Sequence, residues 1–176
     1  MAALFRQFFD RTSCTFTYIL ASHQTAIIID PVVEHTDWYL QLLGEWDLTL
    51  AYSIETHTHA DHITAAGKLR QTTQCKIAVS AQSQASCADI KLEDGQQLKF
   101  GELSITVLAT PGHTDDSICL HCVDRLFTGD TLFIRGTGRT DFQSGSAREQ
   151  YQHIQNKLFT LPDETLVFPG HDFKTL

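Results

Sequence analysis

The chain has few basic residues and no apolar run long enough to cross a bilayer. Its 13 lysines and arginines stand against 21 aspartates and glutamates, a formal net charge of −8 at pH 7. Because negative charge repels phosphates and anionic lipids, we expect neither nucleic acid nor a membrane among the partners. Arg6, Asp10 and Arg11 interrupt the N-terminal apolar residues, so no signal-peptide core forms. These absences predict a cytoplasmic protein, or a mitochondrial matrix protein from which a presequence was removed.

The cysteines do not have the spacing of a disulfide framework. There are five, an odd number, and Cys119 and Cys122 lie within a predicted strand. Side chains three positions apart on a strand point to opposite faces, so these thiols are expected to be separate core residues. The chain has 176 residues, 42% of them hydrophobic, and neither a repeat nor a low-complexity linker. We therefore expect a single domain over residues 1–176 with a sizeable core.

Three histidines and an aspartate are present within residues 57–62, whose sequence is His-Thr-His-Ala-Asp-His. The first two histidines are expected in a tight loop after a strand, and Asp61 and His62 at the start of a helix that runs to about Arg70. Imidazole and carboxylate groups together favour zinc, iron or manganese over calcium or magnesium. This cluster predicts a metal site rather than core or ordinary surface.

Matching groups follow three later predicted strands. They are His113 in Thr-Pro-Gly-His-Thr, Asp130 in Phe-Thr-Gly-Asp, and His171 in Phe-Pro-Gly-His. Each alone is typical of a turn, but such loops in series can meet at one edge of a sheet. The potential ligands for one or two metal ions are His57, His59, Asp61, His62, His113, Asp130 and His171.

The rest of the sequence alternates between strand and helix patterns. Thr36 is expected to cap a short helix whose apolar face holds Trp38 and Leu42, with Tyr39 as a further candidate for that face. A capping box that starts at Ser146 predicts a second helix. Strands are expected at residues 15–20, 26–29, 76–79, 98–100, 103–109, around 119–127 and at 165–168. The first two are expected to form one hairpin, and residues 98–100 and 103–109 a second.

The order His-x-His-x-Asp-His, then His, Asp and His, resembles the metallo-β-lactamase fold superfamily over nearly the whole chain. The resemblance implies an α/β fold, the αββα sandwich, in which two sheets pack face to face with helices outside and the metal site lies at one edge. Relatives normally continue with helical sequence, whereas this chain stops five residues after His171. The fold is therefore expected to be C-terminally short.

A second motif narrows the function. Residues 128–130, Thr-Gly-Asp, and residues 132–143, Leu-Phe-Ile-Arg-Gly-Thr-Gly-Arg-Thr-Asp-Phe-Gln, resemble the persulfide dioxygenases, as do the N-terminal Phe-Arg-Gln-Phe-Phe and Cys-Thr-Phe-Thr-Tyr. The resemblance implies one non-haem Fe(II) per chain held by His57, His113 and Asp130, a facial triad that leaves positions open for persulfide, O₂ or water. The implied reaction converts glutathione persulfide, O₂ and water to sulfite and glutathione.

Two arginines in this motif are candidate substrate contacts. Arg139 lies between glycine and Thr-Asp just past a ligand, and its planar fork suits a substrate carboxylate. Arg135 is either a second contact or a solvated loop residue. The remaining polar groups are implied to orient the ligands and tune the iron; they are His59, Asp61, His62 and His171.

The sequence departs from the persulfide dioxygenases at two places. Asp115 and Asp116 follow the central histidine where relatives commonly carry Pro-Gly, and they are expected to alter the local field or loop shape. Thr137 stands where relatives commonly place a cysteine, so no mechanism here should depend on a thiol at that position.

Two other functions remain open from the residues. A binuclear hydrolase resembling glyoxalase II would hold two zinc ions or mixed metals, with Asp130 as a bridge, and would cleave a thioester. A non-catalytic, metal-stabilised binding module is the third reading. We also expect a homo-oligomer, a dimer or larger, because the last strand has no covering segment after it.

Overall fold

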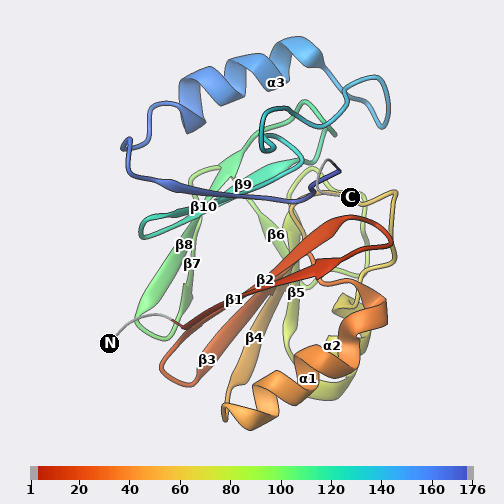
Figure 1. Ribbon diagram of the computed structural model, residues 1–176, viewed down its shortest axis with the longest axis vertical. Coiled ribbons are helices and arrows are strands. Elements are labelled where there is room, and N and C mark those ends of the chain that lie inside the picture. The colour runs from red at the N-terminus through yellow and green to blue at the C-terminus, as the bar shows by residue number, and fades with distance from the viewer. Residues whose placement is uncertain (1–3, 174–176) are drawn as a thin grey trace.

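The computed structural model describes residues 4–173, which form two β-sheets packed face to face with helices outside (Figure 1). The first sheet contains β1 (Leu4–Asp10), β2 (Thr15–Ser22), β3 (Thr25–Ile29), β4 (Thr49–Ile54), β5 (Lys76–Ser80) and β6 (Ile90–Leu92). The second contains β7 (Gln97–Phe100), β8 (Leu103–Ala109), β9 (Ile118–Cys122), β10 (Arg125–Gly129) and β11 (Leu166–Pro169). The helices are α1 (Thr36–Glu45), α2 (Ala66–Thr73) and α3 (Ala147–His153), with a 3₁₀ turn at Val33–His35 and a π-helical turn at Ile154–Leu158.

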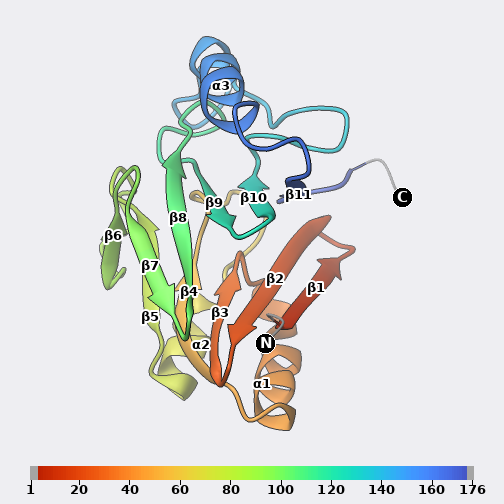
Figure 2. The ribbon, with the colours of Figure 1, turned by 90° about the vertical axis from the view of Figure 1, so that its left-hand side faces the viewer.

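The layers are those of the expected αββα sandwich. The strand order is β1-β2-β3-β4-β5-β6 in the first sheet and β11-β10-β9-β8-β7 in the second. The helices α1 and α2 lie on one side of the sandwich and α3 on the other (Figure 2). Among residues 4–173, no helix is long and apolar enough to cross a membrane.

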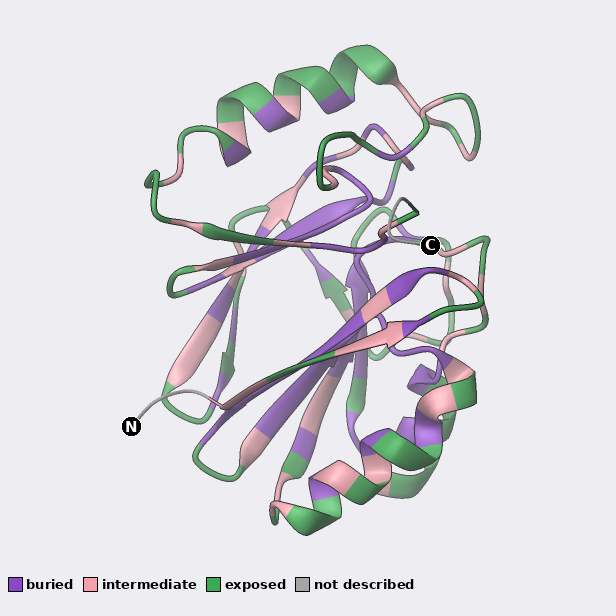
Figure 3. Ribbon diagram, viewed as in Figure 1, coloured by how far each residue is buried: buried purple, intermediate pink, exposed green. Residues whose placement is uncertain are grey.

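The main core lies between the two sheets, where side chains of alternating strand positions meet (Figure 3). Tyr18 of β2 and Phe127 of β10 pack there with ring centroids 5.0 Å apart, which adds to their area burial. The central strand β3 is buried on both faces, because Ile27 and Ile29 face the other sheet while Ile28 faces the helices. A near-continuous apolar run is what such a strand requires.

The cysteine prediction is confirmed in its main point. Cys119 and Cys122 are both free and buried, and they belong to different clusters. Cys122 lies between the sheets, whereas Cys119 packs with Ile154 and Leu158 beneath the helical segment that covers the second sheet. The two thiols therefore point to opposite faces of β9, as their spacing required.

Both predicted hairpins are present, but the predicted capping box is only half formed, because the Ser146 N–H donates to the Gly112 carbonyl and not to the Glu149 side chain. The pairs β2·β3 and β7·β8 are antiparallel, and Ser146 Oγ accepts the Glu149 N–H at 3.3 Å at the start of α3. Two strands were not predicted, β1 and β6. The first is an edge strand whose sequence mixes aromatic and charged residues, and the second spans only Ile90–Leu92.

The predicted helix start at Asp61 is wrong, because α2 begins at Ala66. Residues 63–65 instead extend alongside the chain that follows β3. The Val33 N–H donates to the Ile63 carbonyl at 2.9 Å, and the Ala65 N–H donates to the Pro31 carbonyl at 2.7 Å. These long-range backbone bonds replace the intrahelical bonds that a helix beginning at Asp61 would have made.

The predicted apolar face of α1 is wrong at Trp38 but is confirmed at Leu42, which packs against the cluster between the helix and the first sheet. Trp38 is 61% exposed, whereas Tyr39 and Leu43 are buried against the first sheet. The Tyr39 hydroxyl reaches inward, accepting the Val32 N–H at 3.2 Å and donating to Thr17 Oγ1 at 3.1 Å. A tyrosine whose hydroxyl has buried partners can lie on the inner face, and this turns the helix by one position.

Strand direction brings the ligand loops to one edge of the sandwich. The neighbours β3, β4 and β5 are parallel, and so are β10 and β11, so the carboxyl ends of each group lie side by side. After β11 the chain crosses to the first sheet, where the Phe16 N–H donates to the Gly170 carbonyl at 2.8 Å. This crossing ties the two sheets together beside the site.

Candidate active site

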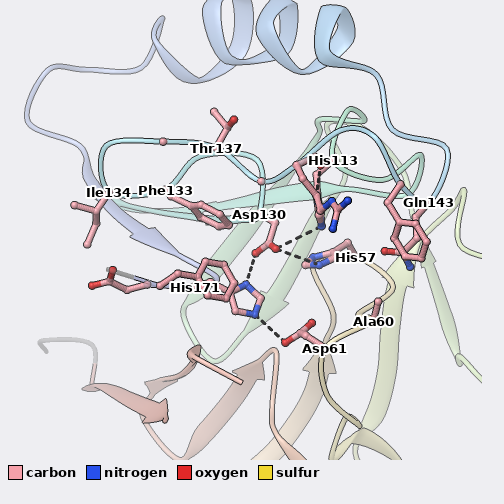
Figure 4. A pocket seen from close by; sticks show the side chains of 16 residues that line it. His57, Ala60, Asp61, His113, Asp130, Phe133, Ile134, Thr137, Gln143 and His171 are labelled. Carbon is pink, nitrogen blue, oxygen red and sulfur yellow. Dashed lines mark hydrogen bonds and ion pairs between the residues drawn. The ribbon is translucent and has the colours of Figure 1, made fainter. Parts of the chain in front are cut away.

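The structure brings His57, His113 and Asp130 together at the ends of β4, β8 and β10 (Figure 4). Asp130 Oδ2 lies 3.9 Å from His57 Nε2 and 3.4 Å from His113 Nε2. One ligand atom from each residue lies within 4.8 Å of the other two. The three residues singled out for the triad therefore share one small volume.

Hydrogen bonds fix which nitrogen of each histidine faces that volume. The Thr56 hydroxyl donates to Asp30 Oδ2 at 2.7 Å, so it can only accept from His57 Nδ1, 3.0 Å away. His113 Nδ1 lies 2.6 Å from the Arg139 carbonyl, which can only accept. In their neutral forms both rings thus carry the proton on Nδ1 and present an unprotonated Nε2 to Asp130.

Burial and neighbouring charge set the ionisation of this group. Burial, followed by repulsion from His59, lowers the pKa of His57 to about 3. Burial alone would raise the pKa of Asp130, but its hydrogen bond with His171 and attraction to the nearby imidazoles outweigh burial, so the pKa lies below its ordinary value. The neutral ring of His57 therefore faces an ionised Asp130 carboxylate.

This donor set fits a divalent transition metal. Three acceptor atoms without a proton between them repel one another unless a cation lies among them. Two imidazoles and one carboxylate are the ligands of mononuclear non-haem iron sites, and zinc also binds them.

His171 supports the other oxygen of Asp130. Its Nδ1 lies 2.6 Å from Asp130 Oδ1, and its Nε2 lies 2.9 Å from Asp61 Oδ2 and 3.1 Å from Thr15 Oγ1. Burial alone would lower the pKa of His171, but the hydrogen bonds with the two carboxylates raise it to about 9. In the metal-free protein the imidazolium bridges Asp130 and Asp61.

The remaining predicted groups form a second cluster beside the first. Ligand atoms of His59, Asp61 and His62 lie within 4.8 Å of one another, and His62 Nδ1 bonds Asp61 Oδ2 at 2.8 Å. Six of the seven predicted ligands thus fall into two groups of three that share no residue, and the seventh, His171, contacts both groups through Asp130 and Asp61. Their roles as supporting residues or as ligands of a second ion stay predictions.

Two buried carboxylates that hold His59 were missed from the sequence. His59 Nε2 lies 3.1 Å from Asp30 Oδ1 and 3.3 Å from Glu55 Oε2. Asp30 also accepts the Thr56 N–H at 2.7 Å, so it holds the loop backbone as well as the ring. The sequence offered only a weak signal, because Asp30 directly follows the apolar run of a predicted strand, where an aspartate is otherwise typical of a turn.

Asp116 shapes the loop that carries His57. It is one of the two residues that replace Pro-Gly of the family pattern, and a change in loop shape was expected there. It is buried and accepts hydrogen bonds from the Thr58 N–H at 3.2 Å, the Thr58 hydroxyl at 2.6 Å and the Thr114 hydroxyl at 2.7 Å. Asp115 beside it is exposed. Asp116 thus fastens the loop of His57 to the loop of His113.

A cavity of about 540 Å³ opens over the triad, and this size suits a small-molecule substrate. Phe133, Ile134, Phe142 and Phe173 give it apolar walls, and His57, His113 and Asp130 line it too (Figure 4).

One of the two candidate substrate arginines lines this cavity. The guanidinium of Arg139 makes a two-pronged pair with Asp141, Nε to Oδ1 at 2.7 Å and Nη2 to Oδ2 at 2.9 Å, and both side chains are exposed. Arg135 is not among the described residues that line the cavity, so a substrate role for it stays a prediction. Thr137 lines the cavity and offers a hydroxyl where the family pattern has a thiol.

Comparison with known proteins places these features in a family. Residues 13–171 match the model of the Metallo-beta-lactamase superfamily. The mitochondrial persulfide dioxygenase ETHE1 of Homo sapiens is 44% identical over 175 residues, which cover 97% of this chain and 68% of that protein. A probable polyketide biosynthesis zinc-dependent hydrolase, BaeB of Bacillus velezensis, is 36% identical over 90% of this chain and 73% of its own length.

The fold comparison agrees with the sequence comparison. The crystal structure of ETHE1 from Myxococcus xanthus superimposes with a TM-score of 0.95 and 51% sequence identity. The superposition covers 98% of this chain and 77% of that one.

Proposed function

Because the chain belongs to the persulfide dioxygenase family of the metallo-β-lactamase superfamily, we propose that it oxidises glutathione persulfide at one iron(II) ion held by His57, His113 and Asp130. Family membership makes the chain an enzyme, a persulfide dioxygenase. The proposal adds the metal, its ligands and the thiol carrier. The observation that supports it is the approach of the Nε2 atoms of His57 and His113 to Asp130 Oδ2.

The overall reaction consumes glutathione persulfide, O₂ and water, and it yields glutathione, sulfite and two protons. The terminal sulfur is oxidised and O₂ is reduced, so no other oxidant or reductant is needed. When bound, ferrous iron supplies the redox chemistry that lets O₂ react beside the sulfur. The protein holds the metal, orients the persulfide and keeps bulk water away.

The cavity walls perform the last of these tasks. Phe133, Phe142 and Phe173 surround the triad with apolar surface. An apolar wall strengthens the attraction between the metal and the charged sulfur of the persulfide, because fewer water molecules screen it.

Arg139 would bind a carboxylate of glutathione. Its fork already holds a carboxylate, that of Asp141, in a two-pronged pair. An exposed ion pair contributes little to stability, so a substrate carboxylate can replace Asp141 at small cost. The persulfide sulfur would then extend from Arg139 toward the triad across the same cavity.

A binuclear hydrolase is the second candidate, and one observation favours it. The group of His59, Asp61 and His62 lies next to the triad and offers ligands for another ion. The Bacillus velezensis relative bears the name of a zinc-dependent hydrolase.

Metal analysis of anaerobically purified protein separates the two. The dioxygenase requires one iron per chain at full activity. Two tightly bound metal ions per chain at full activity, together with thioester cleavage, would contradict the dioxygenase proposal and support the hydrolase.

We also propose a homodimer formed through β11. This edge strand exposes Leu166 and Val167 beside an apolar groove that Phe159 and Leu161 help to line. Exposed apolar area at a sheet edge is commonly buried against a partner. Light scattering at micromolar concentration should give a dimer mass, and Val167→Lys should give a monomer. A wild-type monomer would contradict the proposal.

A cytoplasmic location also remains our prediction. The Homo sapiens relative is named as a mitochondrial protein.

A further inference from the structure

Gln150 of α3 is a buried amide that joins two parts of one active-site loop. It is only 2% exposed, and its Nε2 donates to the Thr131 carbonyl at 3.2 Å and to the Gly138 carbonyl at 3.1 Å. Thr131 directly follows Asp130, and Gly138 directly precedes Arg139. One side chain therefore holds both ends of the segment that runs from a metal ligand to the substrate arginine.

Gln150 also contacts the loop that carries His113. A Cβ placed on Gly112 would collide with the backbone and Cβ of Gln150, so the two residues pack with no room between them. The Ser146 N–H donates to the Gly112 carbonyl at 2.7 Å. The start of α3 is thus fixed against the residue before His113.

The held segment in turn contacts both ligands. The Gly138 N–H donates to the Asp130 carbonyl at 2.8 Å, and a Cβ on Gly138 would lie 2.8 Å from His113 Nδ1. The next carbonyl, that of Arg139, accepts the Nδ1 proton of His113 at 2.6 Å. The position of the segment therefore decides whether His113 presents Nε2 to Asp130.

We propose that Gln150 is a positioning residue that sets the tautomer and orientation of His113 through the Arg139 carbonyl, and with them the placement of the Arg139 side chain. It does so without touching metal or substrate. The inference rests on the proposed function for the identity of the ligands, but the hydrogen bonds on which it depends exist in the metal-free protein.

The competing explanation is that Gln150 simply packs α3 onto the second sheet. Its replacement would then lower stability without a selective effect on His113. The two explanations differ at the His113 ring, because only the positioning role predicts that the bond to the Arg139 carbonyl weakens while the rest of the fold is kept.

The test replaces Gln150 by methionine, which has a similar length and helix propensity but no donor. Gln152→Met is the matched control, because Gln152 lies on the exposed face of the same helix. The first measurement follows exchange of the His113 Nδ1 proton with water, by NMR of metal-free protein labelled in histidine. The second follows release of bound metal to a chelator, well below the melting temperature of every variant.

We expect Gln150→Met to speed proton exchange and metal release by about tenfold or more, since two buried carbonyls lose their donor. The Michaelis constant for glutathione persulfide should rise as well, while Gln152→Met should behave like the wild type. Unchanged exchange at His113 in Gln150→Met, or equal changes in both variants, would overturn the inference.

Gln150→Leu serves if the methionine variant does not fold, because leucine is a good helix former and also lacks a donor. Failure of both to fold, with Gln152→Met folded, would make Gln150 a residue of the general fold and overturn the positioning role. The NMR measurement needs no turnover, so it stands even if the wild type fails to oxidise persulfides.

Discussion

In metal-free protein, the free energy of unfolding should fall as pH rises, because His171 loses a proton that the fold stabilises. Its imidazole lies between Asp130 Oδ1 at 2.6 Å and Asp61 Oδ2 at 2.9 Å. Hydrogen bonds with these carboxylates raise its pKa to about 9, against an ordinary value of 6.5. The folded protein therefore holds a proton there that the unfolded chain gives up.

The sign follows from this difference. A group whose pKa is raised by folding contributes its full stabilisation below the unfolded value and loses it as pH rises through the folded value. The window is thus about pH 6.5 to 9. The folded and unfolded pKa values of His171 differ by about 2.5, and each pKa unit corresponds to about 1.36 kcal/mol. The loss of unfolding free energy across this window is therefore at most roughly 3 kcal/mol. Since the two carboxylates share this interaction, we expect about 1.5–3 kcal/mol.

Urea denaturation in the presence of a chelator measures this loss, and His171→Gln is the matched variant because glutamine does not titrate. Other histidines also titrate, so the quantity to follow is the difference in unfolding free energy between the two proteins. That difference should shrink from about pH 6.5 to about pH 9. A difference that stays constant or grows with pH would refute the reasoning.

Two further predictions concern the site. Asp130→Ala should abolish iron retention, because it removes the only anionic member of the triad, whereas Asp61→Ala should keep part of the metal; equal loss in both, measured by elemental analysis, would favour a binuclear site. Arg139→Ala should lower kcat/KM for glutathione persulfide by about ten- to a hundredfold at unchanged iron content, and Arg139→Lys should restore it only in part because lysine lacks the fork. Loss of iron or of folding in Arg139→Ala would make the residue structural.

The seven candidate ligands could be found in the sequence because their information is local, whereas the choice of His57, His113 and Asp130 among them came from the family resemblance. Each ligand follows a strand pattern directly, and histidine or aspartate after a buried strand is unusual enough to notice in series. The edge at which the loops meet then follows from the fold. For the same reason the hairpins and the cap of α3 were predicted, since turn and capping residues act on their immediate neighbours.

The residues that hold the triad could not be predicted in this way. Asp30, Glu55 and Asp116 act on side chains brought to them by the fold, and an aspartate after a strand is otherwise typical of a turn. Gln150 lies 37 positions from His113 and has the helical setting of any surface glutamine. The start of α2 was misplaced for a related reason, because backbone bonds to Pro31 and Val33 override local helix propensity.

Oxygen consumption and sulfite formation by iron-loaded protein test the proposed function most directly. Protein reconstituted anaerobically with one ferrous ion per chain should consume one O₂ and form one sulfite for each glutathione persulfide, whereas protein loaded with zinc should do neither. Activity that follows zinc rather than iron, or cleavage of a thioester without O₂ uptake, would contradict the assignment of His57, His113 and Asp130 to a single catalytic iron.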